Sequence, residues 1–195
     1  QACFKLGECF EDKIGGSRDR TDAVKYYRWA CGGGVLQACL KVGELREAGI
    51  GVPRDDAEAL VYFGKSCDGA LPVGCARAGK VLRYSVQIPR DKPKAAEWYR
   101  KGCDMKDPAS CLGLGQVLET GINGEPNLEE ARVAYQLAIN EGLAEAKTHK
   151  AYLLWNGLGG KKSKKQAREL CREACGEDAD ACEGPEKLTG AVEPR

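Results

Sequence analysis

The stretch CDGALPVGC, residues Cys67 to Cys75, holds two cysteines eight positions apart across a turn that contains glycine and proline. The same spacing recurs in CGGGVLQAC, which begins at Cys31, and in CDMKDPASC, which begins at Cys103. The first cysteines of the three pairs lie 36 residues apart. A fixed spacing of this size predicts an array of tandem structural repeats.

Other columns of the sequence follow the same period. Cutting the chain every 36 residues gives five units, 1–36, 37–72, 73–108, 109–144 and 145–180. The seventh position of the units is small, as Gly7, Gly43, Gly79, Gly115 and Ala151. The twenty-third position is alanine, at Ala23, Ala59, Ala95, Ala131 and Ala167. The twenty-seventh position is large in four units, as Tyr27, Phe63, Tyr99 and Tyr135, and is Cys171 in the fifth. Small residues facing a large one suit two closely packed helices.

Each unit predicts a helix, a turn and a second helix. In the second unit, residues 37–48 carry apolar side chains at helical spacing, and Gly49, Gly51 and Pro53 then mark a turn. Asp55 follows as an N-cap for the second helix, and its column also holds Asp19, Asp91, Asn127 and Ser163. We therefore predict an all-α, right-handed α/α superhelix (solenoid) of five helix pairs over residues 1–182, with a polar tail at 183–195.

The positions of the repeated cysteines fit this architecture. The first of each pair ends a second helix, and the other lies in the first turn of the next unit, so the turn between them brings the two side chains together. We predict three disulfides between consecutive units, each worth roughly 2–3 kcal/mol by the chain-entropy model. They are Cys31–Cys39, Cys67–Cys75 and Cys103–Cys111. Buried free thiols and a zinc site are the alternatives, although no second pair or histidine lies near each pair in sequence.

Five cysteines fall outside these three pairs. We predict that Cys175 pairs with Cys182, one residue earlier than the period requires, whereas positions 139 and 147 lack cysteine, so that junction has no disulfide. Cys3 is expected to pair with a cysteine before residue 1, which would make the chain a segment of a longer array. Cys9 is expected to be a small buried residue, because a bond to Cys3 along one helix has poor geometry.

Cys171 has two interpretations. In the first it fills the core position that an aromatic residue fills in the other units. In the second it forms a redox or zinc site with Cys175 and Cys182, because three thiolates could bind a metal with a fourth ligand from elsewhere. His149 is the only histidine, and we predict a surface position for it. The lysines between 161 and 165 are expected to form a solvated turn, with a site for an anionic partner as the alternative.

Two segments carry a resemblance to a known family. They are LKVGELREAGIGVPRDDAEALVYF, residues 40–63, and LGLGQVLETGINGEPNLEEARVAY, residues 112–135. Both resemble the Sel-one-like repeat (SLR) family, whose members are relatives of tetratricopeptide repeat proteins. The third unit departs from the pattern because Ser85 and Gln87 replace the turn glycines. The cysteine pairs are similar to those of the cysteine-rich secreted bacterial subfamily, and to those of a mitochondrial intermembrane-space assembly factor.

The resemblance implies a non-enzymatic adaptor or scaffold that binds a protein or peptide and needs no cofactor or metal. It also implies an oxidising compartment, periplasmic or secreted, with the mitochondrial intermembrane space as the alternative. Some cysteine-rich relatives are linked to penicillin binding or weak β-lactamase activity, so a weak hydrolase is an alternative function, as is a thiol-redox or metal-binding protein. The sequence shows no catalytic motif for the hydrolase.

Composition bears on the partner class. The chain has 30 Lys and Arg against 29 Asp and Glu, a net charge of +1. This balance argues against bulk attraction to nucleic acid or an anionic membrane. No apolar run approaches the roughly 18 residues of a membrane span, so no transmembrane segment is expected. The oligomeric state is left open.

The predicted ligand groove follows by analogy with tetratricopeptide repeats, in which the first helices line the concave surface. Its residues are Glu8, Glu44, Glu47, Lys80, Arg83, Tyr84, Gln116, Tyr152 and Trp155. They make an acidic first half, a basic band at the third unit and an aromatic end, which suits a peptide or protein segment of mixed charge. Tyr84, Tyr152 and Trp155 are the predicted exposed anchors. The alternative is an ordinary solvated surface.

Overall fold

The computed structural model describes residues 1–12 and 19–175, which form ten α-helices in five consecutive pairs. The first helices of the pairs are α1 (Ala2–Asp12), α3 (Leu36–Ala48), α5 (Pro72–Tyr84), α7 (Pro108–Thr120) and α9 (Glu145–Asn156). The second helices are α2 (Arg20–Gly32), α4 (Asp56–Asp68), α6 (Lys92–Asp104), α8 (Leu128–Asn140) and α10 (Lys164–Cys175).

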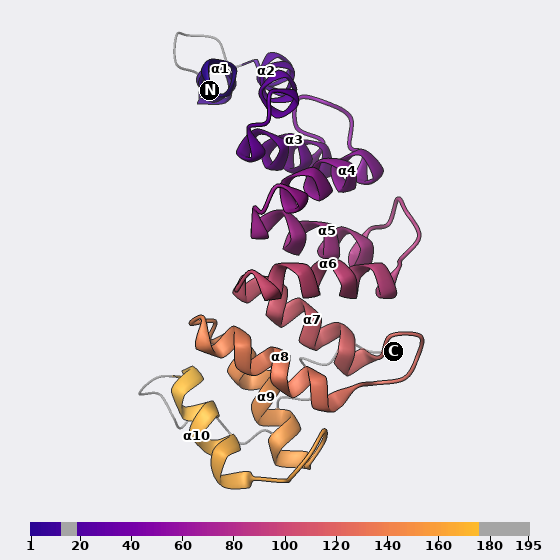
Figure 1. The fold of residues 1–195 in the computed structure, drawn as a ribbon, viewed down its shortest axis with the longest axis vertical. Coiled ribbons are helices and arrows are strands. Elements are labelled where there is room, and N and C mark those ends of the chain that lie inside the picture. The colour runs from indigo at the N-terminus through magenta and orange to yellow at the C-terminus, as the bar shows by residue number, and fades with distance from the viewer. Residues whose placement is uncertain (13–18, 176–195) are drawn as a thin grey trace.

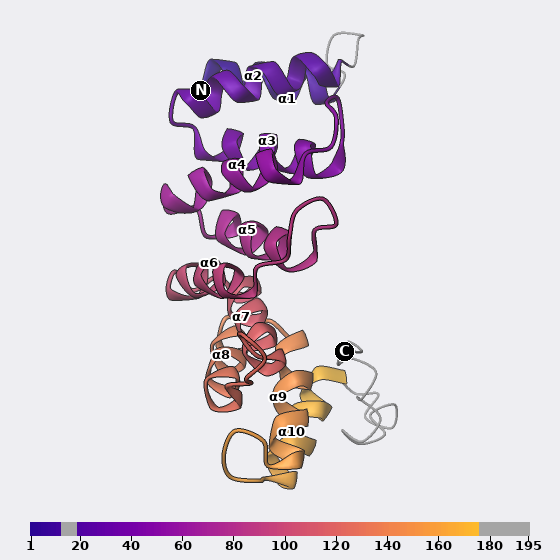
Figure 2. The same cartoon turned by 90° about the vertical axis from the view of Figure 1, so that its right-hand side faces the viewer.

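The pairs stack in chain order into one elongated array, from α1 at one end to α10 at the other (Figure 1). The helix axes turn progressively along the array, so that α1 and α2 lie across the view of Figure 2 while α7 is seen nearly end-on. The described residues contain no strand beyond an isolated bridge between Ile122 and Glu125. The predicted all-α solenoid is confirmed.

The second helices begin at the predicted caps. The Asp55 side chain accepts a hydrogen bond from the Glu58 backbone N–H at 2.8 Å, and the Asp91 side chain accepts one from Lys94 at 3.0 Å. Asp19, Asn127 and Ser163 cap their helices in the same way. At the other end of the turn, Gly49 closes α3 in the left-handed region with φ of +68°, a conformation that costs a glycine least.

Close approach within each pair rests on the seventh position. A Cβ atom at Gly43 would lie 2.6 Å from the nearest ring carbon of Phe63, which is fully buried. A Cβ at Gly7 or Gly79 would meet a Tyr27 or Tyr99 ring atom at 2.6 or 2.8 Å. In the fifth unit both partners change together, since alanine replaces the glycine and cysteine replaces the ring. Because the cysteine is smaller than the ring by more than alanine exceeds glycine, a further side chain, Trp155, packs against Cys171 in the fifth pair.

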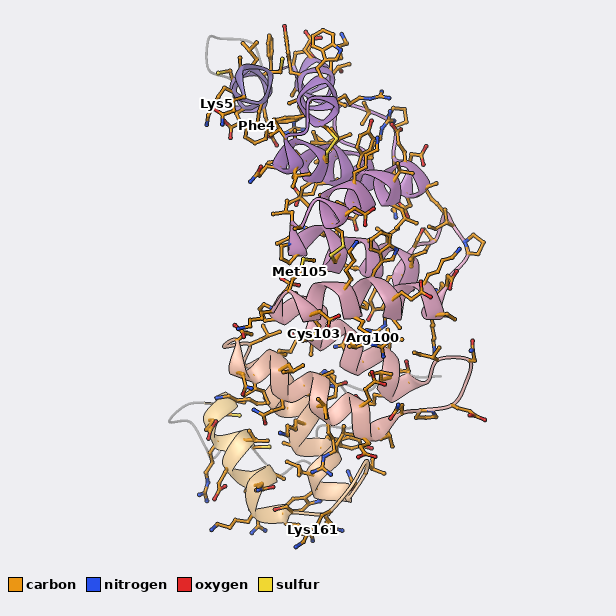
Figure 3. The ribbon with its side chains drawn as sticks, viewed as in Figure 1. Phe4, Lys5, Arg100, Cys103, Met105 and Lys161 are labelled. Atoms are coloured by element: carbon orange, nitrogen blue, oxygen red, sulfur yellow. A yellow bond between two sulfur atoms is a disulfide. The ribbon has the colours of Figure 1, made fainter. Side chains whose placement is uncertain are left out.

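The junctions between units carry disulfides. Cys31 at the end of α2 is bonded to Cys39 in α3, and the two corresponding bonds are Cys67–Cys75 and Cys103–Cys111. Figure 3 labels Cys103 near the end of α6, close to Met105, where the chain turns into α7. All six cysteines are buried. Cys175 is also disulfide-bonded, and its predicted partner Cys182 and the tail at 183–195 lie outside the described residues.

A polar network occupies the turn that lacks glycines. Asp56, at the start of α4, is 2% exposed and accepts two hydrogen bonds from the Arg54 guanidinium, both at 2.9 Å. The Ser85 hydroxyl, from the turn after α5, donates to the same carboxylate at 2.6 Å, and the Gln87 side chain accepts from the Asp56 backbone N–H. The turn of the third unit is thereby tied to the second unit.

This network predicts sensitivity to acid. Hydrogen bonds from Arg54 and from Ser85 hold the pKa of Asp56 below its ordinary value of 3.8, against the opposing effect of burial. Because the folded pKa is the lower one, the stabilisation is present above pH 3.8 and is lost as pH falls through and below that value. We expect Asp56→Asn to lower the free energy of unfolding near neutral pH by about 1–2 kcal/mol and to flatten the acid limb of stability against pH.

Urea denaturation followed by circular dichroism between pH 3 and 7 measures both effects, with Asp68→Asn as the matched control. Asp68 pairs with Lys101 on the surface and its side chain is 63% exposed, so its loss should change little. Equal effects of the two substitutions would contradict the assignment.

Candidate functional site

Successive first helices are joined by polar side chains along the whole array. These contacts join Glu11 to Lys41 (3.5 Å), Glu44 to Arg77 (3.1 Å), Arg83 to Gln116 (2.6 Å) and Gln116 to His149 (3.4 Å). We call this row of side chains the polar ladder. It runs from α1 to α9 and contains three residues of the predicted groove, Glu44, Arg83 and Gln116.

The first three units form a hollow on the ladder. It has a volume of about 390 Å³ and is lined by Glu11, Lys41, Glu44, Leu45, Glu47, Ala48, Ile50 and Arg77. We call it the acidic hollow, because three carboxylates face two cations there. The Arg77 guanidinium lies between Glu44 and Glu47, at 3.1 and 3.6 Å. The carboxylate side chains at Glu11, Glu44 and Glu47 stay 25–31% exposed, so they are accessible to a ligand.

The basic band predicted for the third unit is partly wrong. Lys80 and Tyr84 are exposed as expected, and Tyr84 is 40% exposed. Arg83 is only 8% exposed, because its guanidinium lies 4.7 Å from the centre of the Tyr84 ring and donates a hydrogen bond to the Gln116 side chain. Of the predicted groove residues of the third unit, Lys80 and Tyr84 are therefore the exposed ones, and they lie about one and two helical turns after Arg77 on α5.

His149 is also not the surface residue that the sequence predicted. Its side chain is 11% exposed and stacks on the Tyr135 ring, with 5.1 Å between ring centres. Its Nδ1 lies 3.5 Å from a Glu119 carboxylate oxygen, which also accepts a hydrogen bond from the Tyr135 hydroxyl. Burial, followed by the nearby Glu119 charge, raises the pKa of Tyr135. This cluster fastens α8 and α9 to α7.

The aromatic end of the predicted groove differs most from the prediction. Trp155 is 9% exposed, so it is not an exposed anchor, and Tyr152 is half-buried. Trp155 packs with Ala167 and Cys171 because the small cysteine leaves room that a tyrosine or phenylalanine fills in the other units. Lys164 and Arg168 cover the indole, at 4.7 and 5.4 Å from its centre. One lysine of the predicted solvated turn therefore contacts this ring.

The sequence reasoning missed the residues that hold the ladder together. Lys41, Arg77 and His149 share the fifth position of their units, and of the three only His149 was given a predicted place, at the surface. Each reaches back to the preceding first helix, to a partner at the eighth or eleventh position. The signal in the sequence was the charge of these columns. In the first two units the fifth position is a lysine, whereas the eighth and eleventh positions are glutamates.

The remaining cysteines lie away from the ladder. Cys171 is 4% exposed in the core of the last pair, and its burial raises the pKa of the thiol. Cys9 is only partly buried, so its predicted core position is not reached, and Cys3 is partly buried as well. Within residues 1–12 and 19–175, no group of three or more His, Cys, Asp or Glu side chains is arranged to hold a metal ion.

The repeat period and the stacked helix pairs agree with a family of known sequences. The model of the Sel1 repeat matches residues 1–35, 36–70, 72–107, 108–143 and 144–177. The chain belongs to the Sel1 repeat family. The matched segments differ by only a few residues from the five units cut at the 36-residue period, and Sel1 repeat proteins are generally scaffolds for protein interaction.

Solved structures show the same fold. The Sel1 repeat array described here is similar to c5321, a protective antigen of uropathogenic Escherichia coli with an SLR fold, with a TM-score of 0.82 and 26% identity. That match covers 99% of this chain and 43% of the E. coli protein, so this chain spans less than half of its length. No curated protein matches the sequence.

Two further Sel1-type structures are similar. A Sel1 repeat protein of Oxalobacter formigenes has a TM-score of 0.80 and 18% identity, over 89% of this chain and 72% of its own. Helicobacter pylori cysteine rich protein B has a TM-score of 0.51 and 27% identity, over 66% of this chain and 94% of its own. Among the described helices of this chain, none is long and apolar enough to cross a membrane.

Proposed function

We propose that this Sel1 repeat array is a non-enzymatic scaffold that binds a protein or peptide segment of mixed charge on its first-helix face. The observation that carries the proposal is the acidic hollow, with Lys80 and Tyr84 exposed further along α5 from Arg77. A hollow of about 390 Å³ is large enough for side chains of a bound segment. Its carboxylates, which are 25–31% exposed, favour basic side chains, and Lys80 favours an acidic one.

Rigidity supports the same function. Disulfides at three of the junctions and the polar ladder between successive first helices limit bending of the array. A surface that is already ordered loses less conformational entropy when it binds. Tyr84 would act as an anchor because a rigid, partly exposed ring supplies contact area at small entropic cost.

We also propose an oxidising compartment for the protein, either periplasmic or secreted. Three disulfides whose sulfur atoms are buried favour such a location, because glutathione and thioredoxin keep cytosolic thiols reduced. The partner would then be met outside the cytosol. Neither nucleic acid nor a membrane is proposed as a partner, since the net charge is +1.

A peptide selection tests the proposed face. Random peptides displayed on phage would be selected on the oxidised protein, and the affinities of the selected peptides measured by calorimetry. We expect the double variant Glu44→Lys with Glu47→Lys to weaken binding by about tenfold or more, equivalent to about 1.4 kcal/mol. Tyr84→Ala should weaken it as well.

The matched control is Glu97→Lys on α6, an exposed charge reversal on a second helix. It should leave the affinity unchanged. Peptides that bind all the variants equally would show that the first-helix face is not the site. Failure to select any peptide above the background of reduced, denatured protein would count against the scaffold function itself.

A further inference from the structure

The sixth position of the repeat is apolar and buried in the second, third and fourth units, but it is charged in the fifth. The three apolar residues, each at most 5% exposed, are Val42, Ala78 and Leu114. The fifth unit has Lys150 at this position, in α9. Because the other units pack well with an apolar side chain there, the structure of the repeat gives no reason for a lysine.

The surroundings of Lys150 leave its positive charge poorly compensated. Its Nζ donates a hydrogen bond to the side-chain oxygen of Gln136 on α8. Burial lowers the pKa of Lys150, and the charge of Arg132 lowers it further. No carboxylate in the described part of the chain forms an ion pair with this ammonium group. A partly buried charge without a counter-charge is unfavourable, so an anion bound beside Lys150 would be stabilising.

Lys150 also lines a second cavity, at the end of the array where α8, α9 and α10 meet (Figure 1). The cavity has a volume of about 210 Å³, which is smaller than the about 300–1,000 Å³ of most ligand pockets. It therefore suits a ligand smaller than a typical drug. We call it the Lys150 pocket, and the residues that line it include Gln136, Lys150, Leu154, Glu169, Leu170 and Glu173.

The two carboxylates of the Lys150 pocket differ in their partners. Glu173 forms an ion pair with Lys147 at 3.0 Å, so its charge is compensated. Glu169 is exposed on α10 and forms no ion pair among the residues that the structure describes. The pocket thus offers one uncompensated cation, Lys150, and one uncompensated carboxylate, Glu169. Its apolar lining comes from Leu154 and Leu170.

We propose that the Lys150 pocket binds a small zwitterion of the amino-acid class, with its carboxylate on Lys150, its ammonium group toward Glu169 and an apolar side chain against Leu154 and Leu170. A ligand with a single charge would leave one of the two pocket charges without a partner. The inference does not depend on the acidic hollow, because that hollow is formed by α1, α3 and α5 and by the turn after α3.

Calorimetric titration of the oxidised protein with L-leucine tests the site. Two analogues separate the roles of the ligand charges, since isocaproate is leucine without its ammonium group and isopentylamine is leucine without its carboxylate. We expect leucine to bind with a Kd below about 10 mM, and each analogue to bind about tenfold more weakly or worse. A ligand that binds only the folded state also raises the guanidinium midpoint, which gives a second readout.

Three variants assign the two charges to their residues. Lys150→Met places an apolar side chain of similar length in a column that is apolar in the other units, so it should abolish leucine binding with an unchanged or higher guanidinium midpoint. Glu169→Gln should weaken leucine by about tenfold and leave isocaproate unaffected. The matched control is Lys165→Met, which removes an exposed charge from α10 and should change neither the affinity nor the midpoint.

Several results would overturn the proposal. They are the absence of saturable leucine binding in the parent protein, equal affinities of the parent and Lys150→Met, and isocaproate binding as tightly as leucine. A lower midpoint of Lys150→Met would show that the lysine serves the packing of the junction through its bond to Gln136. Together with unchanged leucine binding in Glu169→Gln, that result would also exclude the zwitterion site.

Discussion

Replacing the six junction cysteines by alanine is expected to lower the free energy of unfolding by about 6–9 kcal/mol, roughly 2–3 kcal/mol for each short loop that the bonds close. Domains of this size are typically stable by about 5–15 kcal/mol. Because this loss is comparable to the whole stability of such a domain, the variant should unfold at a much lower guanidinium concentration than the parent. No other single feature of the array is expected to contribute as much.

The effect of one bond should be local. Cys67→Ala with Cys75→Ala removes the bond between α4 and α5, whose sulfur atoms are fully buried. Because each unit contacts only its neighbours, losing this junction should uncouple the first two units from the last three and broaden the denaturation curve. Guanidinium denaturation followed by circular dichroism and by tryptophan fluorescence would show two separated transitions.

Cys9→Ala is the control for the loss of sulfur, because Cys9 is partly buried and is not in a disulfide. It should change the midpoint little. If the double variant behaves like Cys9→Ala, the junction bonds contribute no stability and the packing of the helices alone holds the array together.

The fold could be predicted from the sequence because every unit repeats the same local rules. The column of Asp19, Asp55 and Asp91 starts the second helices, and each of these side chains caps its helix as predicted. The glycine and aromatic columns meet inside each pair, as at Gly43 and Phe63. Five copies of one pattern make such an inference far safer than a single copy would.

The candidate site was less predictable because the exposure of a long side chain depends on the neighbouring unit. A helical pattern within one unit places His149 and Arg83 on the surface. In the structure His149 is covered by contacts with Tyr135 and Glu119 from the fourth unit, and Arg83 reaches Gln116 from the same unit. Trp155 is buried because Cys171 is small. All of these contacts depend on side chains from other helices, and the first two are made between neighbouring units, whereas the repeat pattern describes each unit by itself.

Gly102→Ser is expected to destabilise the protein, and adding Ser110→Gly, which completes an exchange of the two side chains, is expected to restore most of the lost stability. Gly102 in α6 faces the fully buried Ser110 in α7, and a Cβ atom at Gly102 would lie 2.7 Å from Ser110 Cβ and 3.0 Å from Cys75 Cβ. Gly102→Ser should therefore cost about 1–3 kcal/mol through overpacking. The preceding junction has the same two residue types in reverse order, at Ser66 and Gly74.

The double variant Gly102→Ser with Ser110→Gly copies that preceding junction. The Ser66 hydroxyl donates to the Phe63 carbonyl at 2.8 Å, and a serine at 102 could donate to Tyr99 in the same way. Ser110 Oγ is buried with no hydrogen-bond partner among the described residues, so its removal leaves no partner unsatisfied. Ser110→Gly alone should cost about 1 kcal/mol, since it places a glycine in a helix.

A double-mutant cycle measured by guanidinium denaturation tests the exchange, because the two side chains are in contact and their effects should not add. We expect the double variant to lie within about 1 kcal/mol of the parent, which corresponds to a favourable coupling of about 1–3 kcal/mol. Additive losses would mean that the junctions are not interchangeable. Each junction's own backbone geometry would then decide which of the two positions must be glycine. The two junctions would have in common only the combined volume of the two side chains.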